Sequence, residues 1–173
     1  MAGIPLKGSE RAPLYGSRAT GPADPSEPLL VSVLLRRRAR QELRDRVRRL
    51  AGGDRTSGHL AREEFARQYG AEPADIAAVK TFAASHSLTV IQEHAGRRTV
   101  ILGGTVAQFE AAFGVRLQRC EHSRWGAYRG RQGTIQLPQE LDGVVEAVLG
   151  LDNRPQARTH FRLQQPAGIR KPS

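Results

Sequence analysis

The sequence predicts an α+β fold of the ferredoxin-like split βαββαβ type, in which helices cover one face of an antiparallel four-stranded sheet. Three observations support this fold class. Short runs of branched apolar residues, typical of strands, occur at 29–35, 88–93, 98–102 and 115–121. Segments with apolar residues at helical spacing lie between them. The resulting order of strand, helices, strand, strand, helix and strand is that of the split βαββαβ unit.

The first half of this unit is predicted to contain one strand and three helices. Residues 29–35 are apolar at nearly every position, which indicates a buried strand. An arginine-rich amphipathic helix follows and ends at the glycine pair Gly52 and Gly53. A short helix is expected over 60–69. Pro73 stands where the next helix should begin, because proline is tolerated at the first helical position.

The second half is predicted to contain a hairpin, a helix and a strand. The strands 88–93 and 98–102 are close enough in sequence to pair as a hairpin. Thr105 is a suitable N-cap residue for the helix that follows. Residues 115–121 are then expected to form the fourth strand of the sheet. A loop or a small extra hairpin is expected over 125–135.

An additional helix is predicted to close the folded body. Its apolar residues recur at i, i+3, i+4 and i+7, as on one helix face: Leu141, Val144, Val145 and Val148. The Asn-Arg-Pro sequence at 153–155 then ends regular structure, because proline lacks a hydrogen-bond donor and disfavours a helical conformation of its predecessor. The expected organisation is a flexible N-terminal arm over 1–28, a body over 29–152 and an extended linker over 153–173.

The chain is strongly basic, with a formal net charge of +10 at pH 7. Eight arginines, against two acidic residues, lie between Arg36 and Arg49. This balance favours a negatively charged partner such as an acidic protein, a nucleic acid or a membrane surface. The scarcity of aromatic residues disfavours base stacking on nucleic acid. No apolar run approaches the roughly 20 residues of a membrane span, so a membrane is not an expected partner. We also expect the isolated chain to be monomeric.

The sequence contains no motif that predicts catalysis or metal binding. Cys120 and His122 alone cannot form a zinc site, which needs three or four ligands, and no CxxC or HExxH motif is present. No nucleophile elbow accompanies the Ser, His and Asp residues. Gly103 and Gly104 lack the further residues of a phosphate-binding loop and predict a tight turn. We therefore expect a chain without catalytic residues, metal or cofactor of its own.

Six segments carry a more specific signal. The most specific is VVEAVLGLDNRPQARTHFR at 144–162, because its uncommon composition extends over a long run. The others are KGSERAPLYGSRATGP, LLVSVLLRRR, LAREEFARQYGAEPADIAAVKTFAASHSLTV, GRRTVILGGTVAQFEAAFGVRLQRCEH and WGAYRGRQGTIQLPQEL. These segments resemble the activation pro-domains of kumamolisin-type sedolisins, the serine-carboxyl peptidases. The resemblance covers nearly the whole chain.

The resemblance implies the function of a peptidase pro-domain. Such a domain is the autoinhibitor and intramolecular chaperone of a secreted, subtilisin-like endopeptidase that works in acid. Its partner would be the catalytic domain of the same kind of precursor, in cis or in trans. The Ser-Glu-Asp catalytic set and the calcium site of the family belong to that catalytic domain, and no Gly-Thr-Ser nucleophile segment occurs in this chain. No catalytic role is therefore assigned to any residue here.

The resemblance also implies that the linker lies extended in the substrate cleft of the peptidase, held as an added strand. The predicted cleft residues are Arg154, Pro155, Gln156, Ala157, Arg158, Thr159, His160 and Phe161. We expect the first cut near the bond between His160 and Phe161. Arg36, Arg37 and Arg38 are candidate contacts for acidic groups of the partner.

The alternative to a peptidase pro-domain is a stand-alone basic module that binds nucleic acid or an acidic protein.

Overall fold

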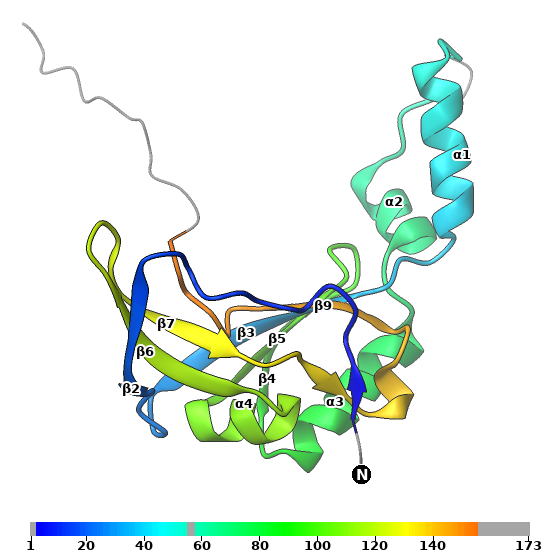
Figure 1. Cartoon of the computed structure of the whole chain (residues 1–173). Coiled ribbons are helices and arrows are strands. Elements are labelled where there is room, and N and C mark those ends of the chain that lie inside the picture. Colours follow the sequence, from blue (N-terminus) through cyan, green and yellow to red (C-terminus); the bar gives the residue numbers. More distant parts are fainter. Residues whose placement is uncertain (1–2, 55–57, 156–173) are drawn as a thin grey trace, which may run out of the picture.

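The computed structural model describes residues 3–54 and 58–155 and confirms the predicted α+β fold. A four-stranded antiparallel sheet has the strand order β4-β5-β3-β9. Its strands are β3 (Pro28–Leu35), β4 (Thr89–His94), β5 (Thr99–Thr105) and β9 (Val145–Leu149). Helices α3 (Pro73–Ser85) and α4 (Val106–Phe113) lie on one face of this sheet (Figure 1). This is the layout of the split βαββαβ unit, with β9 as its fourth strand.

The fourth strand is not the segment that was predicted to form it. That segment forms β6 (Arg116–His122), which belongs to a different sheet. The helix predicted over 141–148 is instead a short 3-10 turn (Gln139–Leu141) followed by β9. Both predictions were wrong for the same reason, since the true fourth strand has the apolar spacing of a helix.

A β-bulge gives β9 this helical spacing. Val145 and Ala147 pair with successive residues of β3, which leaves Glu146 as an extra residue between them. The bulge allows Val145 and Val148 both to be buried although they are three residues apart. Gly143 precedes the strand with φ of 67°, a conformation that a helix does not contain. The apolar pattern therefore reports a bulged strand.

A second sheet forms from part of the predicted arm, the strand predicted at 115–121 and the segment predicted to be a loop or a small extra hairpin. Strands β2 (Ser17–Pro22), β6 and β7 (Gly126–Gln132) pair antiparallel in the order β2-β6-β7. Strand β1 (Ile4–Pro5) pairs with β8 (Gln136–Leu137). Part of the predicted N-terminal arm is thus built into the body. Its Gly- and Pro-containing strands lack an apolar pattern of their own, so pairing with distant partners decides their structure.

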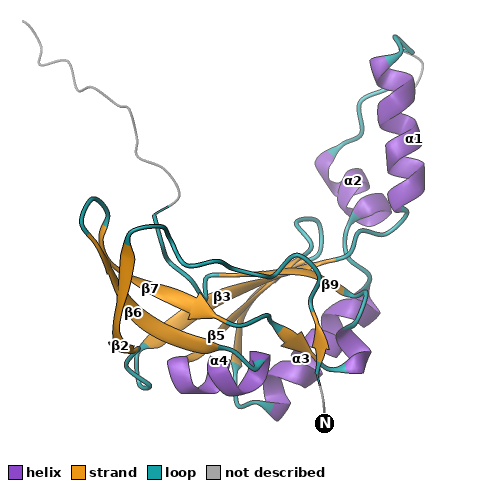
Figure 2. Ribbon diagram, in the orientation of Figure 1, coloured by secondary structure: helices purple, strands orange, loops and turns teal. Residues whose placement is uncertain are grey.

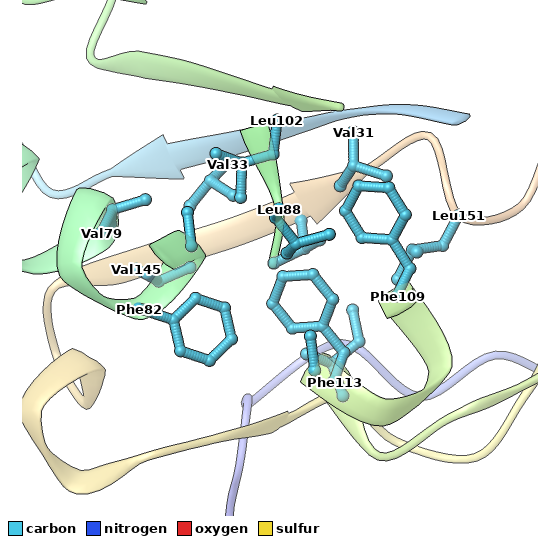
Figure 3. Packing of buried hydrophobic residues seen from close by; sticks show 14 of the residues in the cluster. Val31, Val33, Val79, Phe82, Leu88, Leu102, Phe109, Phe113, Val145 and Leu151 are labelled. Atoms are coloured by element: carbon cyan, nitrogen blue, oxygen red, sulfur yellow. The ribbon is translucent and has the colours of Figure 1, made fainter. Parts of the chain in front are cut away.

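The core lies between the four-stranded sheet and helices α3 and α4, as Figure 3 shows. Val31 and Leu102, on β3 and β5, are fully buried. Three phenylalanine rings pack against one another beneath the sheet. The ring centroid of Phe113 lies 5.4 Å from that of Phe82 and 6.3 Å from that of Phe109. Apolar burial on this side therefore fixes the sheet and both helices as one unit.

Helix α4 begins and ends at the residues that its sequence predicts. The Thr105 hydroxyl accepts a hydrogen bond from the Gln108 amide, and the Gln108 side chain accepts one from the Thr105 amide. This reciprocal arrangement is a capping box. Gly114 ends the helix in the left-handed conformation, with φ of 60°.

Helices α1 (Arg40–Ala51) and α2 (Arg62–Tyr69) form a projection, the helical arm, that lies away from both sheets (Figures 1 and 2). Helix α1 contains no buried residue, and its Val47 and Leu50 are exposed. Helix α2 buries Tyr69. The predicted helices therefore divide into two groups: α3 and α4 cover the sheet, whereas α1 and α2 leave it.

Candidate docking face, arm base and linker exit

The face of the four-stranded sheet opposite α3 and α4 exposes large apolar side chains. Leu30 on β3, Ile91 on β4 and Leu149 on β9 retain 64%, 55% and 59% of their surface exposed. Successive side chains of a strand point to opposite faces, so Leu30 points away from the buried Val31. Exposed apolar residues gathered on one face of a domain make that face a candidate contact surface for another molecule. We call this surface the open face.

Gly103 lies at the centre of the open face and keeps it flat. It pairs with Leu30 on β3 and with Thr89 on β4. A Cβ atom at Gly103 would lie 3.0 Å from Cδ1 of Ile91 and 3.7 Å from Cδ2 of Leu30. The two side chains therefore cover the glycine from both sides. Gly103 is a strand residue, so the tight turn predicted at Gly103 and Gly104 was wrong.

Two ion pairs join the segment that leads from β3 into the helical arm to the start of α3 in the body. Arg36 donates from Nε and Nη2 to the two carboxylate oxygens of Asp75, at 2.7 and 2.9 Å. Arg38 donates from Nη2 to Oε2 of Glu72 at 2.7 Å. The Asp75 side chain is 6% exposed, whereas that of Arg36 is 51% exposed. The hydrogen bonds that Arg36 donates to Asp75 raise the pKa of Arg36 above its ordinary value.

Further contacts complete this arm base. The guanidinium carbon of Arg37 lies 5.4 Å from the ring centroid of Phe65 on α2, which is a cation–π arrangement. The bulge residue Glu146 accepts a hydrogen bond from Arg98 at 2.8 Å and forms an ion pair with Arg40, the first residue of α1. The bulge in β9 therefore links the arm to the edge of the sheet.

The three arginines predicted to contact an acidic partner, Arg36, Arg37 and Arg38, all lie in this arm base. Each has an intramolecular contact in the domain. Contact between these arginines and a second protein stays a prediction. The sequence could not reveal the internal pairs, because Asp75 and Glu72 are 39 and 34 residues away from their arginines.

The chain after β9 crosses to the second sheet and is attached there. We call residues 150–155 the linker exit. The amide of Asn153 donates to the carbonyl of Arg129 at 3.0 Å, and the Arg129 amide donates to Oδ1 of Asn153 at 2.6 Å. Nε of Arg129 donates to the carbonyl of Leu151 at 3.0 Å, and Nη2 donates to that of Gly150 at 3.2 Å. Arg129 on β7 therefore holds the start of the predicted linker.

An ion pair between Asp152 and Arg154 completes the linker exit. Nη2 of Arg154 lies 2.6 Å from Oδ2 of Asp152, and the side chains are 10% and 7% exposed. Burial raises the pKa of Asp152, but hydrogen bonds from the Arg154 side chain and from the amides of Arg154 and Arg131 more than offset it. The pKa of Asp152 therefore lies below its ordinary value. The charged pair is the stable form at neutral pH.

The predicted cleft residues fall into two groups. Arg154 and Pro155 belong to the linker exit, and Arg154 turns its guanidinium back onto the domain. The residues from Gln156 to Phe161 lie outside the described part of the chain. Their place in a substrate cleft stays a prediction.

Over 3–54 and 58–155, no group of three or more His, Cys, Asp or Glu side chains could hold a metal ion. In the same part of the chain, no helix has both the length and the apolar character to cross a membrane. Cys120 is a buried free thiol on β6.

The sequence profile of the family described as Pro-kumamolisin, activation domain matches residues 15–154. The chain belongs to this activation domain family. Kumamolisin from Bacillus sp. (strain MN-32) is 39% identical over 148 residues, which cover 85% of the chain and 27% of that relative. Tripeptidyl-peptidase sed5 from Aspergillus fumigatus is 27% identical over 169 residues, which cover 87% of the chain and 28% of that relative. The chain thus spans about a quarter of the length of these two curated relatives.

Family membership confirms the resemblance seen in the sequence. The match includes the open face and extends to Arg154 in the linker exit. Sequence reasoning did not single out Leu30, Ile91 and Leu149 as functional residues. One signal was available, because a sheet covered by helices on one face does not need apolar residues at every position of β3.

Proposed function

We propose that this activation domain is the pro-domain of a secreted, acid-active serine-carboxyl endopeptidase precursor. It acts as an intramolecular chaperone and as an autoinhibitor, and its linker occupies the substrate cleft until acid triggers self-processing. The domain supplies no catalytic residue and binds no cofactor, since the catalytic set and the calcium site belong to the peptidase domain. The open face, on a chain of this family, is the observation that carries the proposal.

The chaperone role follows from the contrast between the two faces of the sheet. One face is packed on α3 and α4, so the sheet and both helices share a hydrophobic core without a partner. The other face offers Leu30, Ile91 and Leu149 to apolar groups of the peptidase domain. Large domains with many contacts between distant residues fold slowly. A preformed apolar sheet would lower that barrier, because it buries part of the peptidase surface early.

The inhibitor role follows from the same contact. After folding, the open face keeps the domain on the peptidase, and the linker leaves from the exit at Asp152 and Arg154. Beyond Pro155, the linker lies in the substrate cleft as an added strand and is cut first near the bond between His160 and Phe161. Inhibition after this cut depends on affinity alone, so the free domain should inhibit in trans.

Acid weakens the complex through carboxylates of the peptidase that pair with arginines of the domain. Pairing lowers the pKa of a carboxylate in the complex. The stabilisation is present above the free pKa of about 4 and is lost as the pH falls through the lowered value. Exposed pairs contribute little each, so several must act together.

The test compares two substitutions of equally exposed apolar residues. Ile91 on the open face and Val47 on the helical arm are each 55% exposed. Ile91→Ser should weaken inhibition of the mature peptidase at neutral pH by roughly tenfold or more, about 1.4 kcal/mol. Val47→Ser should leave the inhibition constant unchanged. Thermal unfolding of both variants checks that the domain remains folded.

Three results would each contradict one part of the proposal. A purified wild-type domain that leaves the peptidase fully active at micromolar concentration would exclude the inhibitor role. Equal inhibition by the Ile91→Ser variant and the wild type would exclude the open face as the docking surface. An inhibition constant that does not change between neutral and strongly acidic pH would exclude the acid trigger but not the inhibitor role.

A further inference from the structure

The pair of Asp152 and Arg154 lies in a segment that forms no strand of either sheet. Strand β9 ends at Leu149, and residues 150–155 form no helix or strand. Even so, both charged side chains are at least 90% buried. Removing two charges from water has a large desolvation cost, so a buried ion pair is weak evidence for a stabilising role. The pair therefore needs another explanation.

The contacts of this pair join three separate parts of the chain. Asp152 accepts a hydrogen bond from the amide of Arg131 on β7 at 3.2 Å. Nη1 of Arg154 donates to the carbonyl of Ala12, between β1 and β2, at 2.7 Å. The guanidinium carbon of Arg154 also lies 5.9 Å from the ring centroid of Tyr128. The linker exit is thus attached both to the second sheet and to the N-terminal segment.

We propose that Asp152 and Arg154 are positioning residues that fix where the cleft-occupying linker leaves the domain. This inference rests on the proposed function. Residues up to Pro155 are then already ordered when the open face docks, so less conformational entropy is lost as the linker enters the cleft. A fixed starting point also raises the effective concentration of the linker at the cleft. Arg154 therefore stays on the domain and is not itself a cleft residue.

The experiment measures how the effect of Arg154→Met depends on the linker. Inhibition constants are determined against the mature peptidase from the chain's own precursor, at neutral pH. Two lengths are used, residues 1–173 and residues 1–155. Arg154→Met should weaken inhibition by the longer chain by about tenfold or more, and it should leave inhibition by the shorter chain unchanged. The matched control is Arg18→Met, which removes an arginine from an exposed pair with Glu121 and should change neither.

Asp152→Asn is the second variant, because it removes the charge and keeps the size of the side chain. Like Arg154→Met, Asp152→Asn should weaken inhibition by the chain of residues 1–173 and leave inhibition by the chain of residues 1–155 unchanged. Unfolding curves show whether each variant is folded. Hydrogen exchange gives an independent readout: the amides of Asn153 and Arg154 should exchange faster in Arg154→Met, while those of β9 keep their rates. In the precursor, the variant should be cut at several bonds where the wild type is cut at one.

The outcomes separate this inference from the proposed function. If the wild-type chain does not inhibit, the proposed function fails, and the positioning role fails with it. If the wild type inhibits and both variants inhibit equally well, the positioning role alone is wrong. An equal loss in the long and short chains would show that Arg154 contacts the peptidase directly, and this too would overturn the inference.

Discussion

The body and the helical arm are held together by different forces. In the body, apolar side chains such as Phe109 and Val100 are completely buried between the sheet and its helices. In the arm, α1 buries no side chain and α2 buries only Tyr69, while arginines at the arm base pair with Asp75, Glu72 and Glu146. The hydrophobic effect changes little with pH or salt, whereas ion pairs depend on both. The two regions should therefore respond to different perturbations.

The largest effect is expected from a cavity in the body. Phe109→Ala removes a fully buried ring that packs against Phe113, which should lower the free energy of unfolding by about 3–5 kcal/mol. Chemical denaturation measures this loss. Val47→Ala on the arm should change the same free energy by less than about 0.5 kcal/mol. Comparable losses in the two variants would erase the difference between body and arm.

A smaller effect is expected at the arm base. Asp75→Asn removes the partner of Arg36, and because Asp75 is buried the lost charge-assisted hydrogen bonds should cost about 1–3 kcal/mol. The loss should be visible as faster hydrogen exchange in α1 and α2 with little change in the four-stranded sheet. The matched control is Glu93→Gln, from the half-exposed pair with Lys80, which should have almost no effect. Uniform acceleration over both regions would show that the arm is not a separate unit.

The pH dependence of the free energy of unfolding should reveal the contribution of Asp152 in the linker exit. The pKa of Asp152 is lowered in the folded domain, so its contribution to stability is fully present above the unfolded value of about 3.9. It is lost as the pH falls through the lowered value. Asp152→Asn should therefore destabilise the domain at pH 7, and the difference from the wild type should shrink toward pH 2. A stability difference between Asp152→Asn and the wild type that is the same at pH 7 and pH 2 would contradict a lowered pKa of Asp152.

The smallest effect is expected for salt on the arm base. Raising the ionic strength from 0.1 to 1 M shortens the screening length from about 10 to about 3 Å. The pair of the half-exposed Arg36 with Asp75 and the pair of Arg38 with Glu72 should weaken. Hydrogen exchange of α1 amides should therefore become modestly faster. The amides of β3 and β5 should keep their rates, because their protection comes from the apolar core. Identical salt effects on both regions would argue against charge pairs as the attachment of the arm.

Much of the body follows from local sequence signals. The apolar run of β3, the proline that begins α3, and the Thr105 and Gly114 caps of α4 act within a few residues, and all are confirmed. One exception is the segment 141–148, which was predicted as a helix. There a bulge at Glu146 produced the apolar spacing of a helix, so this spacing alone does not distinguish the two cases.

The candidate site was less predictable than the fold. The resemblance indicated the family and placed the linker near the end of the chain. It did not indicate that Arg154 binds back to Asp152, Ala12 and Tyr128. The exposed residues of the open face were missed because an apolar run does not say which of its side chains face solvent.

The sequence by itself determined the class of fold and many of the helices and strands, because propensities, caps and apolar spacing are local properties. Its resemblance to known pro-domains indicated the family. Only the tertiary structure decided which strand completes the sheet, which apolar side chains remain exposed and which carboxylate each arginine meets. These features depend on contacts between residues far apart in the chain, and such contacts exist only after the sheets and helices have packed.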